Sequence, residues 1–77
     1  MITVQVCSED TGKPLQGKRV SVWTDEIITG GKVDSEQRTN GSGEAHFDTE
    51  RINKGKVIVE GKEKYKGQIS GRTVVYL

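Results

Sequence analysis

Apolar and polar side chains alternate with a period of two over most of the chain. The first two such segments are ITVQVC at residues 2–7 and KRVSVWT at residues 18–24. Because successive side chains of a strand point to opposite faces, each segment places aliphatic residues at every second position on one face. The intervening SEDTGKP is a cluster of turn formers. We therefore expect two strands separated by a loop.

Shorter alternating segments follow in the second half. The pattern predicts strands in EAHFD (residues 44–48), KVIVE (residues 56–60), YKGQIS (residues 65–70) and RTVVYL (residues 72–77). In the first of these, Ala45 and Phe47 share the face that we expect to point inward, and His46 lies opposite. The polar segment VDSEQRT at residues 33–39 has few strand formers, so we expect at best an exposed or edge strand there.

The length and composition of the chain restrict the fold that these strands can form. It has 77 residues, of which 31% are apolar and 10 are glycine, and no stretch has the i, i+3, i+4 apolar spacing of an amphipathic helix. Six or seven short strands cannot bury themselves as one flat sheet. We predict a single all-β domain over residues 1–77, a small antiparallel Greek-key β-sandwich of about seven strands.

Three motifs occur in an order that resembles a known family. TGKPLQGKRVSV, TNGSGEAHF and NKGKVIVEGKEKY together resemble the prealbumin-like or carboxypeptidase-regulatory-like β-sandwich, a class that includes transthyretin-like and CnaB-type domains. The resemblance implies that Leu15 and Val20 close one end of the sandwich and that Gly17 permits a close approach of the chain. It also implies that Gly43 turns the backbone into the strand that follows. These motifs are turn and packing signatures, so they indicate a fold and not an activity.

The glycines and the histidine of TNGSGEAHF could also belong to a catalytic or binding site. A phosphate-binding loop presents its amides at the start of a helix, but GSGEAHF leads into an alternating strand. A general base needs an orienting partner and a metal needs further ligands, whereas His46 is the only histidine. We expect His46 to face solvent and the lone Cys7 to be a small buried residue, with no metal and no cofactor.

Two enzymatic relatives of this fold provide alternatives. Hydroxyisourate hydrolases of the transthyretin-like group end in Tyr-Arg-Gly-Ser, which YKGQ at residues 65–68 resembles in part. The resemblance implies a small hydrolase that uses His46 with a nearby Lys or Arg. CnaB-type domains form a Lys–Asn isopeptide bond, but the first strand has no Lys and RTVVYL has no Asn, so we do not expect a self-crosslink.

The charges argue against a strong attraction to nucleic acid or to an anionic membrane. Twelve basic and eleven acidic residues give a net charge of +1. A weak single-stranded nucleic-acid site remains an alternative around Tyr65, because Lys62, Lys64, Lys66 and Arg72 flank an aromatic ring that could stack on a base. The acidic interruptions Glu60 and Glu63 favour a solvated strand face instead.

Two other segments could form a binding surface. Trp23 lies opposite the aliphatic face of its strand, and Ile27 and Ile28 are adjacent, so in a strand one of them would point away from the core. The alternative is that this hairpin folds over the end of the sandwich as a lid. The apolar RTVVYL segment is either a central strand or an edge strand that pairs with another chain.

Together these observations favour a non-catalytic binding or structural module that presents loops and an edge strand to a protein or carbohydrate partner. The candidate binding residues are Trp23, Ile27, Ile28, Lys64, Tyr65 and Lys66. The last strand could also join two copies of the chain. We find neither a signal peptide nor a membrane-spanning segment in the sequence, so we expect a cytoplasmic location, or an extracellular one if the chain is a domain cut from a secreted protein.

Overall fold

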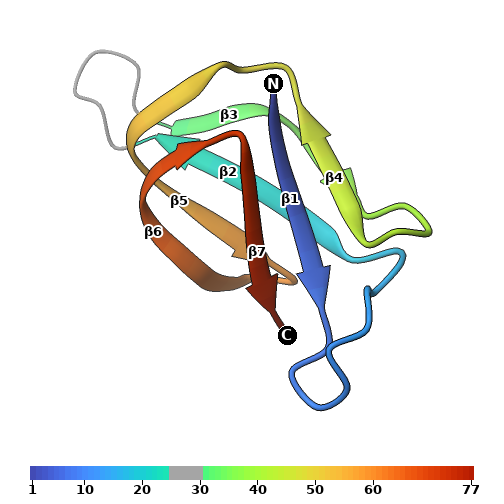
Figure 1. Cartoon of the computed structure of the whole chain (residues 1–77). Coiled ribbons are helices and arrows are strands. Elements are labelled where there is room, and N and C mark those ends of the chain that lie inside the picture. Colours follow the sequence, from blue (N-terminus) through green and yellow to red (C-terminus); the bar gives the residue numbers. More distant parts are fainter. Residues whose placement is uncertain (25–30) are drawn as a thin grey trace.

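A computed structural model describes residues 1–24 and 31–77, and these residues form an all-β fold (Figure 1). The described residues contain seven strands: β1 (Ile2–Cys7), β2 (Arg19–Thr24), β3 (Gly31–Arg38), β4 (Glu44–Phe47), β5 (Arg51–Val59), β6 (Lys62–Ser70) and β7 (Arg72–Tyr76). Within them, no helix is long and apolar enough to cross a membrane. The predicted fold class, a small β-sandwich of about seven strands, is confirmed.

The strands form two sheets that pack face to face. One sheet has the order β4-β1-β7 and the other has the order β3-β2-β5-β6 (Figure 1). The chain moves between the sheets after β1, β3, β4 and β6, so neither sheet is a simple meander. Connections that cross between two packed sheets are typical of Greek-key sandwiches.

The core lies between the sheets and is built from the aliphatic positions of the alternating pattern. The buried residues of this core are Ile2, Val4, Val6, Val20, Val22, Ala45, Phe47, Ile52, Val57, Val59, Ile69 and Val75. Leu15, Tyr65 and Leu77 are partly buried against them. Cys7 is also buried but does not belong to this cluster. The inward faces predicted for the first two strands, for Ala45 and Phe47, and for Val57 and Val59 are confirmed, as is the burial of Cys7.

One pair of strands departs from the antiparallel prediction. β1 pairs with β7 in parallel, with Val4 opposite Thr73 and Val6 opposite Val75. All other neighbouring strands are antiparallel. The parallel pair is possible because β7 returns from the other sheet, whereas a tight hairpin can only join antiparallel neighbours. The polar β3 is an edge strand of the four-stranded sheet, as expected from its composition.

Gly43 and Gly17 both have the positive φ that favours glycine, but for different reasons. A Cβ atom at Gly43 would lie 2.7 Å from the carbonyl oxygen of Val6 and 2.8 Å from Cβ of Pro14, so this turn needs glycine for space as well as for its φ of 75°. Gly17 has a φ of 78°, and a Cβ atom at this position would have no neighbour within 4 Å. The predicted close approach at Gly17 is therefore wrong, and a turn conformation explains this glycine instead.

Candidate functional site

The three-stranded sheet turns a polar outer face to solvent, and strand register places its side chains in rows. Thr3 lies opposite both His46 of β4 and Arg72 of β7, and Gln5 lies opposite both Glu44 and Val74. Cys7 lies opposite Tyr76 at the far end. Residues opposite each other in a sheet share a face, so these rows run from polar at one end to apolar at the other.

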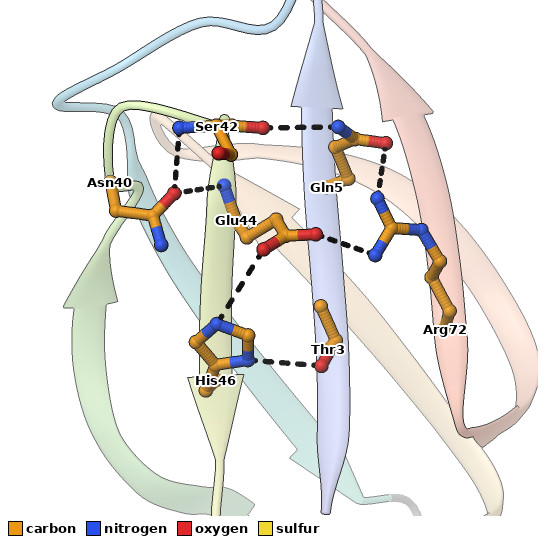
Figure 2. Close-up of polar contacts among 7 residues, drawn as sticks. All are labelled: Thr3, Gln5, Asn40, Ser42, Glu44, His46 and Arg72. Atoms are coloured by element: carbon orange, nitrogen blue, oxygen red, sulfur yellow. Dashed lines mark hydrogen bonds and ion pairs between the residues drawn. The ribbon is translucent and has the colours of Figure 1, made fainter.

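Arg72 joins the three strands of this sheet through hydrogen bonds from its guanidinium group (Figure 2). One nitrogen donates to Oε2 of Glu44 at 2.5 Å, and another donates to Oε1 of Gln5 at 2.8 Å. The amide nitrogen of Gln5 in turn donates to the carbonyl oxygen of Ser42 at 3.0 Å. Because these bonds bridge β4, β1 and β7, they fix the side chains on the face next to the β7 edge.

His46 continues this network, with a hydroxyl group on one side and a carboxylate on the other. Its Nδ1 lies 3.0 Å from Oγ1 of Thr3, and its Nε2 lies 3.8 Å from Oε1 of Glu44 (Figure 2). The side chain is 45% exposed, as predicted for an outward-facing histidine. Catalytic triads also contain a hydroxyl, an imidazole and a carboxylate, but 3.8 Å exceeds hydrogen-bond length and Glu44 is already bonded to Arg72. The arrangement therefore suits a structural network better than a nucleophile.

The turn before β4 holds the polar face in place. Oδ1 of Asn40 accepts hydrogen bonds from the backbone N–H groups of Ser42, at 2.9 Å, and Glu44, at 3.0 Å (Figure 2). Thr39 precedes it and is buried, and its Oγ1 donates to the carbonyl oxygen of Leu15 at 2.5 Å. The TNGSGEAHF segment thus forms a turn that leads into a strand, with local side-chain caps of the kind that asparagine and threonine supply.

The outer edge of β7 is the second feature of this face. The N–H of Thr3 donates to the carbonyl of Gly71, and the N–H of Leu77 donates to the carbonyl of Cys7. In a parallel ladder the bonding residues alternate along the strand, so residues 71, 73, 75 and 77 point their backbone groups to β1. The backbone N–H and C=O groups of Arg72, Val74 and Tyr76 therefore point away from β1.

No strand among residues 1–24 and 31–77 pairs with that side of β7. Val74 and Tyr76 are 42% and 52% exposed, and both are among the large hydrophobic side chains most exposed in the structure. This answers the question left open by the sequence, because the apolar C-terminal strand is an edge strand of its sheet. Unpaired backbone groups beside exposed apolar side chains are the usual template for adding another strand.

The predicted binding residues of the other sheet do not all come together. Trp23 lies on the outer face of the four-stranded sheet, opposite Lys56, which is itself opposite Lys66. Tyr65 is opposite Val57 and packs against the core, and its hydroxyl donates to the carbonyl of Gln68 at 2.7 Å. Its ring is therefore turned toward the interior of the sandwich.

The predicted basic cluster around Tyr65 is also divided between the sheets. Lys64 and Lys66 lie on β6, whereas Arg72 lies on β7 and is engaged with Glu44. Ile27 and Ile28 lie outside the described residues. The described residues contain no group of three or more His, Cys, Asp or Glu side chains that could hold a metal ion.

Comparison with known protein families, curated proteins and solved structures gives no significant match to this chain. Any functional conclusion therefore rests on the geometry of the described residues alone. Sequence reasoning missed the bonding of Arg72 to Glu44 and Gln5, because it assigned Arg72 to the basic cluster. The period of two in RTVVYL was the available signal, since it groups Arg72 with Val74 and Tyr76 on one face.

Proposed function

We propose that this protein is a non-catalytic binding module that presents the edge of β7 to an extended segment of a polypeptide. The main support for the proposal is one observation. The backbone groups of Arg72, Val74 and Tyr76 point outward on the side of β7 where the described residues supply no neighbouring strand. Addition of a strand to such an edge supplies affinity through backbone hydrogen bonds and specificity through alternate side chains.

The spacing of these backbone groups favours a polypeptide over a carbohydrate. Outward-pointing N–H and C=O groups recur at every second residue, about 6.6 Å apart in a strand. A second strand presents complementary groups at the same interval, whereas a sugar chain has no such repeat. The exposed side chains of Val74 and Tyr76 then provide apolar contacts on the outer face.

The polar network around Arg72 supports the proposed binding because it holds the β7 edge in a fixed position. Arg72 bonds to Glu44 of β4 and Gln5 of β1, so the first outward-pointing residue of β7 is held to the rest of its sheet. A fixed edge loses less conformational freedom when a partner binds than a mobile one would. We also propose that the domain belongs to the prealbumin-like class that its sequence resembles, and the two-sheet fold and the Gly43 turn support this assignment.

A substitution at Val74 tests the proposed edge, because its N–H points away from β1. Proline has no N–H, so Val74→Pro removes an outward donor without removing a β1–β7 hydrogen bond, and proline is tolerated on edge strands. Val74→Thr is the matched control, because it keeps the backbone donor and the β-branched shape. Both variants are first compared with wild type by circular dichroism and urea unfolding.

Binding is then measured by titrating a 15N-labelled sample with synthetic strand-forming peptides, including an acetylated RTVVYL peptide. We expect amide shifts at residues 72, 74 and 76 in wild type and in Val74→Thr, and loss of binding in Val74→Pro. Binding that is unchanged in a folded Val74→Pro variant would refute the proposed edge. Shifts centred on Trp23, or loss of binding in an Ile27→Ser, Ile28→Ser double variant alone, would place the surface elsewhere.

A further inference from the structure

We infer that the strand that occupies the β7 edge is β7 of a second copy of this chain, paired antiparallel about a two-fold axis at Val74. This inference rests on the proposed function, since it names the partner of the same edge. It would join two three-stranded sheets, each β4-β1-β7, into one continuous sheet. Two-fold pairing of this kind requires a surface that is complementary to itself.

The hydrogen-bond geometry of β7 satisfies that requirement. In an antiparallel pair, opposed residues that point their backbone groups at each other exchange both N–H···O=C bonds. A two-fold axis at Val74 places Val74 opposite its own copy and Arg72 opposite Tyr76 of the second copy. All of these residues point their backbone groups outward, so each opposed pair is a hydrogen-bonded pair. A shift of one residue would instead oppose Val74 to Thr73 or Val75, whose backbone groups face β1, so no opposed pair could exchange both bonds.

The side chains in this register are also complementary. The two Val74 side chains would meet at the axis, where β-branched residues form favourable cross-strand pairs. At each end, Arg72 of one copy would lie beside Tyr76 of the other, a cation next to an exposed aromatic ring. Arg72 keeps its bond to Glu44 in this arrangement, because that bond lies toward β4 and not toward the new strand.

The other sheet edges carry features that oppose strand addition, and β7 does not. β4 has only four residues, and charged residues recur along the other two edge strands: Glu36 and Arg38 on β3, and Lys62, Glu63, Lys64 and Lys66 on β6. Charged residues and short strands protect edges from unwanted pairing. Within β7, Arg72 is the single charged residue and stands at one end. The contrast selects β7 as the edge for self-association.

The size of the interface predicts a weak dimer. Pairing through one five-residue strand buries less surface than a standard protein interface, and interfaces of this size are transient. We expect a dissociation constant on the order of 10–100 µM. Sedimentation velocity from about 1 µM to 1 mM should therefore show a monomer that converts to a dimer. In Val74→Pro the dimer should weaken by at least about tenfold, whereas Val74→Thr should resemble wild type.

Disulfide trapping tests the register independently of affinity. A thiol introduced by Val74→Cys would face its own copy with the Cα atoms about 5.5 Å apart, within the range that a disulfide spans. Tyr76→Cys is the matched control, because residue 76 of one copy would lie four residues, about 14 Å, from residue 76 of the other. Both variants carry Cys7→Ala, because Cys7 lies opposite Tyr76 in the β1–β7 pair and a thiol at position 76 would otherwise have a partner within its own chain. We expect a covalent dimer from Val74→Cys and little from Tyr76→Cys under mild oxidation.

The outcomes separate this inference from the proposed function. A wild-type protein that stays monomeric at about 1 mM would overturn the inference, and so would a covalent dimer that forms equally well from both cysteine variants. If that monomer still bound strand-forming peptides at residues 72–76, the proposed function would stand and only the second copy would be excluded. A monomer that bound no peptide would overturn both.

Discussion

Replacement of Gly43 by alanine should destabilise the protein far more than the same replacement at Gly61. Both glycines have a positive φ, 75° at Gly43 and 80° at Gly61, so alanine is strained at either position. The surroundings differ. A Cβ atom at Gly43 would meet the Val6 carbonyl oxygen at 2.7 Å and the Leu15 nitrogen at 3.1 Å, whereas Gly61 has nothing within 4 Å.

The expected magnitudes follow from these two contributions. Left-handed backbone costs alanine roughly 1–2 kcal/mol at both sites. Gly43→Ala adds the cost of forcing the β4 turn away from β1 and from the loop at Pro14, about 1–3 kcal/mol. The total at Gly43 is then roughly 2–5 kcal/mol, against a whole stability of about 4–12 kcal/mol for a chain of this length. Reduced freedom of the unfolded chain offsets both variants by similar amounts.

Urea unfolding measures the difference, with the fluorescence of Trp23 as the probe because it is the only tryptophan. We expect the midpoint of Gly43→Ala to fall well below that of Gly61→Ala, with similar slopes for all three proteins. Equal losses of unfolding free energy in the two variants would refute the reasoning. In that case left-handed strain alone would account for Gly43, and the contact between the turn and Val6 would not constrain the fold.

Four further predictions concern other parts of the sandwich. Hydrogen bonds from the backbone N–H and then the side chain of Arg19 lower the pKa of Glu60 below its ordinary 4.5. The stability they supply is present above pH 4.5 and lost as the pH falls through the folded pKa, so the urea midpoint should drop on acidification more in wild type than in Glu60→Gln. Asn40→Ala should cost about 1–2 kcal/mol in the same assay, because two backbone N–H groups lose their acceptor, while Asn40→Asp should retain most of the stability. Wild type and His46→Ala should be equally inactive on a panel of ureides and esters, and turnover lost only in His46→Ala would favour the hydrolase alternative. The protein should pass through heparin and single-stranded DNA columns at low salt, and retention that falls in a Lys64→Ala, Lys66→Ala variant would favour the nucleic-acid alternative.

The core was predictable because burial in a sandwich follows the period of two. Val20, Val22 and Phe47 each lie at an alternating position, and each is fully buried. The local pattern was sufficient there, because a strand with one aliphatic face turns that face toward the opposite sheet. The polar composition of residues 33–39 likewise indicated an edge, and β3 is one.

Lys64 shows where the local pattern was insufficient. The period of two groups Tyr65 with Ile69, and both contact the core; an exposed ring belonged only to the nucleic-acid alternative. Val57 lies opposite Tyr65 and Ile58 lies opposite Glu63, which leaves Lys64 as an extra residue in β6. Such a bulge changes which face each following side chain occupies. Its position depends on pairing with β5, and pairing is not visible in the sequence of β6 alone. The same limit applies to the parallel β1–β7 pair and to the bond between Arg72 and Glu44.

β7 divides its residues between folding and the proposed binding. Val75 buries its side chain in the core and bonds its backbone to β1, so it serves the fold with both. Arg72, Val74 and Tyr76 place their side chains on the outer face and their backbone groups on the open edge. Side-chain direction and backbone direction therefore alternate together along β7. Substitutions at Arg72, Val74 or Tyr76 can alter the proposed association, while Val75 keeps β7 in the sheet. Loss of pairing without loss of stability, in a folded Val74→Pro variant, is the behaviour that distinguishes an edge used for binding from one that only completes the sheet.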